Sequence, residues 1–358
     1  MRTPAYRSHT KPRTANPRHD ANRGRMKTEQ KWAIGNGLEL LDEQDKQSVA
    51  LVILDLPYYG VVSDEWDNQW KNLDDYLEWC KEWFIKSERC LKDNGALYYF
   101  NSQFKVIKAI DTLIESSTKL KFRQFITIDK GLQSVAGRVS EALRSYPKAS
   151  EFLTFYTFDD FTGAEMLSDE ISSRNPMAKY LLSEIQRAGV TQGELRALFP
   201  SKTGNETGCI TNWVKGYNCP LKWQYELIRT YLNSKGDEYL RKEYEDLRKE
   251  YEDLRYPFNS MSGFTDTWQF DFYKEKRYKH PTQKPFSLIE RIVLTSSNEG
   301  DLVIDPAMGT GTTFKVCKAH NRNFNGRELN PDYEKDIISR AMVNTPRLDS
   351  WIPSKEDA

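Results

Sequence analysis

The N-terminal half of the chain alternates short apolar runs with amphipathic stretches from about residue 31 to 160. Four apolar runs predict strands: "SVALVILD" (48–55), "GALYYF" (95–100), "FRQFITID" (122–129) and "SEFLTFYTF" (150–158). Residues 73–91 instead place their apolar positions near one helical face: Leu73, Tyr76, Leu77, Trp83, Phe84 and Cys90. Strands that alternate with helices predict an α/β fold with a doubly wound, mostly parallel sheet.

Residues 176–257 break this rhythm, because they are helical in pattern, polar and rich in Tyr and Trp. "GDLVIDPAMGTGTTFKVCKAH" (300–320) then restores a strand, a glycine turn and a helix. We therefore expect an α/β domain written in two halves around a helical insert. The expected divisions are an N-terminal extension, a first half, the insert, a second half and a tail: 1–30, 31–175, 176–257, 258–345 and 346–358.

Inside the insert, "KEYEDLR" occurs twice in tandem, at 242–248 and 249–255. Its apolar positions follow heptad spacing, and Lys242 and Asp246 are spaced for an ion pair within a helix. These apolar positions are Tyr244, Leu247, Tyr251 and Leu254. Two heptads are too few for a coiled coil, so the repeat predicts a solvated helix that packs one stripe.

Composition excludes several classes of protein. The 358 residues carry no formal net charge, so contact with a polyanion must come from local patches. The sequence contains no apolar run of membrane-spanning length and does not begin like a secretory signal, so we expect a protein of the cytoplasm without a membrane partner. Five scattered cysteines and four histidines predict reduced thiols, with neither a disulfide framework nor a metal site.

Residues 1–25 carry seven Arg or Lys side chains against one acid, Asp20, and almost nothing apolar. Such a composition cannot bury a core and predicts disorder. The segment is either a basic arm that touches phosphates or the product of an upstream start. We favour the second interpretation, because Met26 opens a more ordinary sequence.

The glycine turn after residue 305 has the pattern of a ligand site. Asp305 ends a predicted strand, and Gly309 and Gly311 allow a ligand to approach the backbone at the start of a helix. The third glycine of a dinucleotide fingerprint is absent, and no GK[ST] follows, so this is not a phosphate-binding P-loop. Taken alone, the pattern is explained equally well by a structural turn.

An acid at the end of the next predicted strand, Glu328, can accept hydrogen bonds from both hydroxyls of a ribose. Taken alone, Glu328 could equally be a surface acid. Together with Asp305 and the glycine turn, it indicates a cofactor with a ribose but not necessarily a pyrophosphate. S-adenosylmethionine fits, because its sulfonium and amino groups are cationic and would be attracted to Asp305.

A second site is indicated by "LVILDLPYYG" (51–60), where a buried strand stops at a carboxylate, Asp55. A leucine, a proline and two aromatic rings follow at once: Leu56, Pro57, Tyr58 and Tyr59. A carboxylate and flat rings at the end of a strand are typical of the mouth of a binding site.

These motifs resemble those of the amino-methylating DNA methyltransferases. "DLPYYG" resembles their D-P-P-Y catalytic motif, "DPAMGTGTT" resembles their cofactor motif D-P-F-x-G-S-G-T-T, and "HPTQKP" (280–285) matches the motif upstream of that turn. "GNGLELL" (35–41) resembles G-D-C-x-E-x-L, and "SEFLTFYT" stands where the family has H-E-x-I-L-F-F-T. The order is that of the β-type, circularly permuted group with its Rossmann-like fold, and the resemblance covers residues 31–160 and 265–343.

The resemblance implies a role for each residue of the first motif. The target base is flipped out of the duplex, and Tyr58 stacks on its ring. The Asp55 carboxylate and the Leu56 carbonyl accept the hydrogens of the exocyclic amine, which aims the nitrogen lone pair at the methyl group. Pro57 fixes the turn. Leu56 stands where the family has the first proline of D-P-P-Y. The resemblance implies that this position contributes only its backbone carbonyl, so a leucine side chain is tolerated.

The resemblance also implies a set of cofactor-binding residues: Asn36, Gly37, Asp55, Thr282, Gln283, Lys284, Asp305, Ala307, Gly309, Gly311, Thr312, Thr313 and Glu328. Asn36 stands where the family has an acid, which leaves its contact with the cofactor open.

In this family the insert position holds the target-recognition region. Residues 190–220 also resemble a repressor-type helix-turn-helix, with a first helix capped by Thr191. The expected second helix, 207–216, turns Ile210 and Trp213 inward and presents three DNA-binding side chains: Thr211, Asn212 and Lys215. A plain helical bundle that positions the catalytic domain is the alternative.

The sequence thus predicts a sequence-specific enzyme that methylates adenine N6 in double-stranded DNA with S-adenosylmethionine, in a prokaryotic or phage-like cell, as a possible homodimer. The carboxylate Asp55 favours adenine over cytosine N4, since cytosine enzymes of this group more often carry serine there. Two further alternatives are an enzyme acting on a protein amide or an RNA base, and a DNA-binding regulator on an inactive scaffold. A restriction partner is not visible in one sequence.

Overall fold

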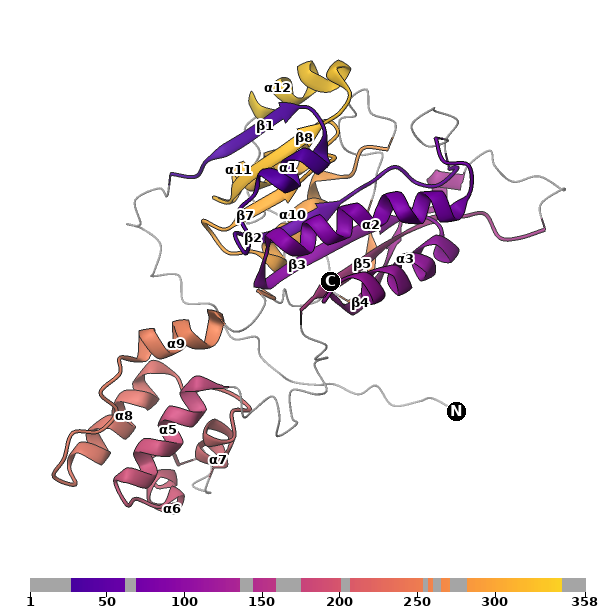
Figure 1. The fold of residues 1–358 in the computed structure, drawn as a ribbon. Helices are drawn as coiled ribbons and strands as arrows, with labels where there is room; N and C mark the ends of the chain where they lie inside the picture. The colour runs from indigo at the N-terminus through magenta and orange to yellow at the C-terminus, as the bar shows by residue number, and fades with distance from the viewer. Residues whose placement is uncertain are drawn as a thin grey trace, which may run out of the picture.

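The fold is described from a computed structural model, which covers residues 27–61, 69–135, 144–158, 175–200, 207–253, 257–259, 265–270 and 282–342. In these residues one sheet of eight strands forms the centre of the α/β part, with the helical insert beside it (Figure 1). The predicted N-terminal extension and C-terminal tail lie almost wholly outside the described residues, as do His280 and Pro281 of the "HPTQKP" motif.

The sheet has the order β1-β8-β7-β2-β3-β5-β4-β6. Its strands are β1 (Gln30–Ile34), β2 (Val49–Leu54), β3 (Leu91–Asn101), β4 (Lys121–Asp129), β5 (Ser150–Thr157), β6 (Thr267–Gln269), β7 (Leu302–Asp305) and β8 (Asn323–Glu328). All neighbours pair in parallel except β5, which runs antiparallel to both β3 and β4. The prediction of a mostly parallel sheet is confirmed.

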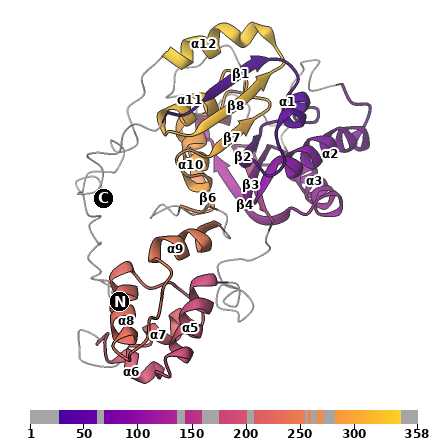
Figure 2. The ribbon, with the colours of Figure 1, turned by 60° about the vertical axis from the view of Figure 1, so that its left-hand side comes forward.

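Alternate residues of β2 face two different helix layers, as the period of a strand requires. Val52 and Leu54 pack in one buried cluster against α1 (Gly37–Glu43), α2 (Leu73–Cys90) and α3 (Phe104–Ser117). Leu51 and Ile53 pack in the other against α10 (Phe286–Ser296), α11 (Thr312–Ala319) and α12 (Glu334–Met342). The helices of the first half and those of the second half therefore cover opposite faces of the sheet (Figure 2).

Two short 3₁₀ helices complete the α/β part, η2 (Leu132–Val135) and η4 (Pro331–Tyr333). The five cysteines of the chain are free thiols, and Cys80, Cys90 and Cys317 are buried. The described residues contain no cluster of side chains able to hold a metal ion. Within the same ranges, every helix is too short or too polar to span a bilayer.

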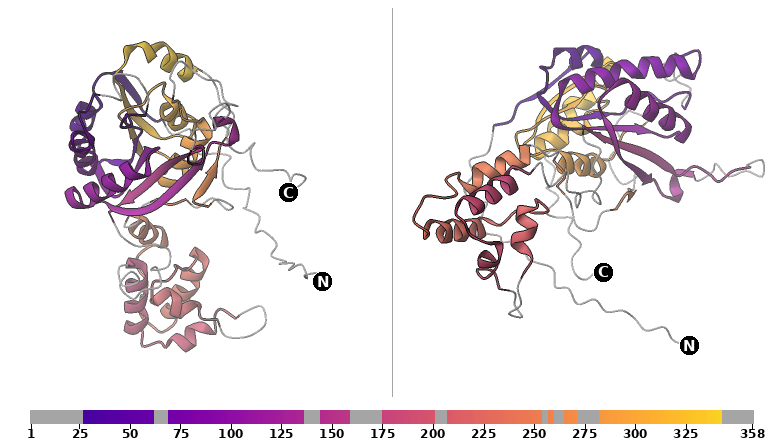
Figure 3. Two further views of the ribbon diagram at one scale, coloured as in Figure 1. Left: turned by 90° about the vertical axis from the view of Figure 1, so that its right-hand side faces the viewer. Right: turned by 60° about the horizontal axis from the view of Figure 1, so that its bottom comes forward.

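The insert is a bundle of helices with a hydrophobic core of its own, visible as a separate body in both views of Figure 3. It contains α5 (Pro176–Arg187), α6 (Gln192–Arg196), α7 (Cys209–Val214), α8 (Lys222–Asn233) and α9 (Tyr244–Asp253). Residues 244–253 of the tandem repeat form α9, where Leu247 is fully buried, and the predicted stripe residue Leu254 lies outside the described residues. Lys242 precedes this helix, and its ammonium contacts Glu250 at 2.8 Å instead of the predicted Asp246.

The two predicted reader helices are present as α6 and α7, but both are short. Thr191 caps α6 and forms a capping box with Glu194, as the sequence predicted. Ile210 and Trp213 are buried, which confirms their predicted inward orientation. Residues 201–206, which join the two helices, lie outside the described part of the chain.

The three predicted DNA-binding side chains of this segment differ in accessibility. Asn212 and Lys215 are exposed. Thr211 is half-buried, and its hydroxyl lies 3.2 Å from Gln192 Oε1 and 3.4 Å from Arg196 Nη2. Thr211 therefore joins α7 to α6, while Asn212 and Lys215 stand on the outer surface of α7.

Trp213 should hold the insert together. It is 4% exposed and meets Phe199 edge to face at 5.2 Å between ring centroids. Replacing a buried Trp by alanine costs about 3–5 kcal/mol, so Trp213→Ala should unfold the insert and leave the α/β part folded. Hydrogen exchange resolved along the chain checks this. Uniform protection in 175–253, unchanged from wild type, would contradict it.

Candidate active site

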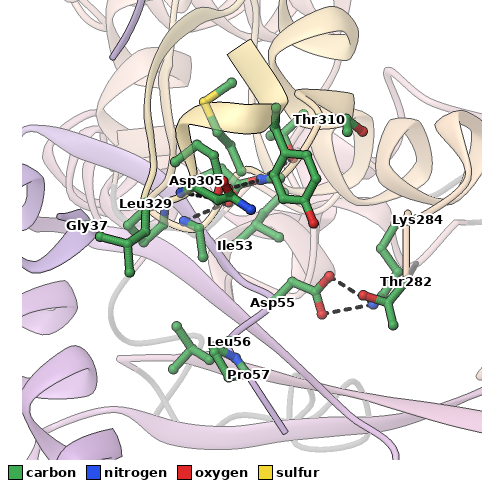
Figure 4. Close-up of a pocket in the computed structure, with 18 of the residues that line it drawn as sticks. Gly37, Ile53, Asp55, Leu56, Pro57, Thr282, Lys284, Asp305, Thr310 and Leu329 are labelled. Atoms are coloured by element: carbon green, nitrogen blue, oxygen red, sulfur yellow. Dashed lines mark hydrogen bonds and ion pairs between the residues drawn. The ribbon is translucent and has the colours of Figure 1, made fainter. Parts of the chain in front are cut away.

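The candidate site is a cavity of about 390 Å³ at the carboxyl ends of β2 and β7, which are neighbours in the sheet. Ligands of open α/β sheets bind at this edge, outside the ends of parallel strands. Asp55 follows β2, and Asp305 ends β7, so the pairing of two strands brings both predicted motifs to one cavity. Figure 4 shows both carboxylates among the residues that line it.

Lys284 ties the second half of the chain to Asp55. Its ammonium lies 2.8 Å from both carboxylate oxygens of Asp55 and 3.2 Å from Glu151 Oε1. The side chains of Lys284 and Glu151 are 5% and 7% exposed, and that of Asp55 is 23% exposed. Two carboxylates and one cation are thus in direct contact and largely buried, and Figure 4 shows the contact between Lys284 and Asp55.

Tyr58 is anchored to the same cluster through its hydroxyl. This hydroxyl donates to Glu151 Oε1 at 2.6 Å and lies 3.1 Å from Asp55 Oδ1. The Lys284 ammonium lies 5.5 Å from the centre of the Tyr58 ring. Tyr58 lines the cavity, whereas Glu151 does not. The hydrogen bond from the hydroxyl to Glu151 therefore fixes the tilt of the ring from outside the cavity.

The charges of this cluster shift its pKa values in opposite directions. Burial raises the pKa of Asp55, which Lys284 opposes and the charge of Glu151 reinforces. Burial acts to raise the pKa of Glu151, but Lys284, Lys130 and the hydrogen bond from Tyr58 together lower it. Burial acts to lower the pKa of Lys284, and the two carboxylates raise it instead. The pKa values of the two acids are therefore shifted in opposite directions, upward for Asp55 and downward for Glu151.

The glycine turn is built around Asp305. Gly309 and Gly311 have φ angles of 53° and 80°, in the left-handed region that glycine tolerates. One Asp305 oxygen accepts from Ala307 N at 3.2 Å, and the other accepts from the Thr313 hydroxyl at 2.5 Å. Burial raises the pKa of Asp305 to about 7, although the hydroxyl of Thr313 opposes the shift.

Glu328 ends β8 beside this turn and closes the same cavity. Its two oxygens accept from Gly309 N and Asn330 N, each at 2.8 Å. A carboxylate has about four acceptor positions, so both oxygens keep capacity for ligand hydroxyls. Burial raises the pKa of Glu328, while the backbone donors lower it.

Two other backbone positions shape the cavity. Asn36 caps α1 by accepting from Leu38 N at 2.9 Å. Gly37 follows it, and a Cβ there would lie 2.0 Å from the carbonyl oxygen of Pro306. Glycine is required at position 37 because the start of α1 packs against the backbone of Pro306, in the turn after β7, without room for a side chain.

Two buried polar atoms of the cavity wall have no hydrogen-bond partner among the described residues. They are the Thr310 hydroxyl and the indole nitrogen of Trp83. Leaving such a group unpaired costs about 1–3 kcal/mol, so both are suited to a polar ligand. Together with Glu328 and Asp305, they fit a cofactor with a ribose and cationic groups.

The structure brings the predicted site residues together with one exception. Every predicted catalytic and cofactor-binding residue lines the cavity except Gly311, which caps the N-terminus of α11 instead. Leu56 is 1% exposed, which is compatible with the predicted role of its carbonyl. Lys284, predicted to bind the cofactor, instead directs its ammonium to Asp55, the carboxylate predicted to be catalytic.

Sequence reasoning missed part of the wall and the residue behind it. Glu151 was quoted within "SEFLTFYT" without a role, although an acid inside an apolar strand pattern was a usable signal. The cavity is also lined by apolar and aromatic side chains to which the sequence analysis assigned no role in a site: Leu38, Ile53, Val61, Trp79, Trp83, Met308, Leu329 and Tyr333.

Comparison with known proteins finds relatives of this sequence over most of its length. Residues 49–339 match the N6/N4 methyltransferase family, which is described as DNA methylase. The Type II methyltransferase M.HpaI of Haemophilus parainfluenzae is 25% identical over 312 residues, 85% of this chain and 72% of that protein. The DNA adenine methyltransferase YhdJ of Escherichia coli is 40% identical over 90 residues, 24% of this chain and 31% of that protein.

Among solved structures, the cytosine-N4-specific PvuII DNA methyltransferase has the same fold. The likeness has a TM-score of 0.51, covers 90% of each chain and comes with 12% sequence identity.

Proposed function

The chain belongs to the family of N6/N4 DNA methylases, and we propose that it transfers a methyl group from S-adenosylmethionine to the N6 amine of an adenine flipped out of double-stranded DNA. One observation carries the proposal: Asp55 and Tyr58 share a single cavity with Asp305 and Glu328. A residue set for an exocyclic amine and one for a ribose-bearing cofactor thus face the same space, as a direct transfer requires.

S-adenosylmethionine supplies an electrophilic methyl group on a sulfonium when bound. Glu328 would hold the ribose hydroxyls, and Asp305 would face the cationic part. The unpartnered Thr310 hydroxyl would complete the polar contacts of the same wall. The residues present therefore fit this cofactor, and no covalent nucleophile of the protein is needed.

On the other side of the cavity, the Tyr58 ring would stack on the flipped base. The Asp55 carboxylate and the Leu56 carbonyl would accept the two hydrogens of the amine. The amine nitrogen uses its lone pair to form the new bond to carbon, while the electrons of the sulfur–carbon bond remain on sulfur. The surplus amine proton would pass to the Asp55 carboxylate, whose pKa is raised by burial.

Adenine is favoured over cytosine by the carboxylate at position 55, and a relative named as an adenine methyltransferase supports it. The PvuII enzyme acts on cytosine N4, but at 12% identity the likeness concerns the fold. A regulator on an inactive scaffold would not need the intact Asp55, Pro57 and Tyr58. We assign the recognition of sequence to the insert, through Asn212 and Lys215 of α7.

We place the reaction in the cytoplasm of a prokaryote, where DNA is accessible and where the bacterial relatives belong. The possible homodimer remains a prediction, and we assign no restriction partner.

The reaction itself is tested by mass spectrometry of nucleosides from DNA treated with the chain. N6-methyladenine should appear with the wild type and disappear with Asp55→Asn and Asp55→Ala, while cofactor affinity stays within about twofold. The asparagine keeps the shape and removes the charge that holds the amine. N4-methylcytosine without N6-methyladenine would refute adenine, and turnover near wild type in both variants would refute the site.

Cofactor binding should depend on Asp305 and Glu328. Replacing either with alanine removes a contact that is worth roughly 1.5–3 kcal/mol, about ten- to hundred-fold in affinity. Because the pKa of Asp305 is about 7, wild-type affinity should fall as the pH drops through 7 and Asp305 loses its charge. Asp305→Asn should lose this dependence on pH.

Calorimetry measures these affinities, and Asp301→Ala is the matched control. Asp301 precedes β7 and pairs with Lys92 at 3.1 Å, so its loss should leave affinity unchanged. Equal affinities in the Asp305, Glu328 and Asp301 variants would rule out the proposed cofactor site.

Target choice should depend on the exposed face of α7. Asn212→Ala and Lys215→Ala should weaken binding of the preferred site by about 1–3 kcal/mol if they touch bases, with cofactor affinity unchanged. Lys179→Ala, at an exposed position of α5 in the same insert, is the control. Binding to a panel of DNA sequences decides the matter: a loss common to Lys179 and Lys215 would mean general charge attraction.

A further inference from the structure

The buried cluster contains a difficulty for the chemistry just described. Lys284 occupies both oxygens of Asp55 at 2.8 Å. An amine that enters the cavity must therefore compete with a charged ammonium for the carboxylate that should orient it. Charge-assisted hydrogen bonds are roughly twice as strong as neutral ones, so a second partner for the ammonium would free acceptor positions of Asp55 for the substrate.

Glu151 is that partner. Its Oε1 already lies 3.2 Å from the Lys284 ammonium and accepts the Tyr58 hydroxyl at 2.6 Å. It comes from β5, behind Tyr58, and does not line the cavity. Glu151 thus touches the residue that stacks on the base and the residue that blocks Asp55, without reaching the base itself.

A purely structural role does not account for the charge of Glu151. A neutral glutamine of the same size would offer the Tyr58 hydroxyl the same kind of acceptor. Burying a further carboxylate beside Asp55 costs free energy and leaves the trio with one more negative than positive charge. The extra charge has an effect that neutral residues cannot reproduce, because it offers the Lys284 ammonium a second anionic partner.

We propose that Glu151 is a positioning residue of methyl transfer, which draws the Lys284 ammonium off one oxygen of Asp55 as the amine enters and holds the Tyr58 ring at its stacking angle. This inference rests on the proposed function and assigns a role to a residue to which the sequence analysis gave none. The exchange needs no large movement, because the ammonium already lies within 3.3 Å of all three partner side chains.

The other charged and titratable groups near the cluster favour an ionised Glu151. Lys130 beyond β4 lowers its pKa, and Lys148 before β5 feels its charge. The charge of Asp55 acts on Asp305 of β7 and raises its pKa. Asp55 and Tyr99 of β3 both raise the pKa of Tyr58. Because the charge of Glu151 raises the pKa of Asp55, its removal should make Asp55 a weaker base.

The test compares Glu151→Gln with wild type in single-turnover methylation of a DNA that the enzyme modifies. The rate should fall about tenfold or more, since one charge-assisted contact is lost, while KM for DNA, cofactor affinity and thermal stability change little. The acidic limb of the rate against pH should move to lower pH. Glu151→Asp should restore the position of that limb, because the charge returns.

Glu290→Gln is the matched control for losing a buried glutamate. Glu290 is 2% exposed and contacts His320 at 2.5 Å, outside the cavity. Its rate and pH limb should stay those of wild type. A Glu151→Gln rate equal to wild type would overturn the inference, and so would a lower rate with an unmoved limb and lost thermal stability.

The two proposals fail in different ways. If the wild type methylates adenine and Glu151→Gln does so equally fast, the role of Glu151 is refuted and the proposed function stands. If the wild type methylates no DNA, the proposed function is refuted and the role of Glu151 with it.

Discussion

The parallel pairing of β2 with β7 is the interaction on which the rest of the site depends. It joins Leu51 to Val303 and Val52 to Ile304, residues about 250 positions apart in the chain. Because parallel strands end at the same edge, the residues after β2 and at the end of β7 must meet there. Asp55 and Asp305 share a cavity for this reason, and the helices that follow each strand cover opposite faces of the sheet.

The sequence was sufficient for whatever depended on local pattern. Apolar runs located most of the strands, although not the edge strands β1 and β6, and the acids after β2 and at the ends of β7 and β8 marked the edge where the cavity lies. Contacts between distant segments were out of its reach. Lys284 meets Asp55 across 229 positions and Tyr58 meets Glu151 across 93, and no periodicity encodes either pair. The lengths of α6 and α7 were also overestimated, since neighbours in the bundle decide where short helices end.

The buried cluster shows why a motif residue cannot be assigned from its motif alone. Lys284 belongs to a segment expected to bind the cofactor, yet its ammonium faces the catalytic carboxylate. Its backbone faces the other way, because its carbonyl accepts the hydroxyl of Thr312 at the start of α11. One residue therefore links the glycine turn to Asp55. A cofactor that orders the turn would also constrain the ammonium that competes for the amine.

The separate core of the insert has a consequence for the division of labour. The buried residues of α5 to α9 form a cluster of their own, distinct from both layers of the sheet. Substitutions on the outer face of α7 therefore leave the packing behind Asp55 and Glu328 intact. Because Ile210 and Trp213 anchor α7 while Asn212 and Lys215 stay exposed, the contacts that we propose for choosing a DNA sequence could change without disturbing the cavity proposed for methyl transfer.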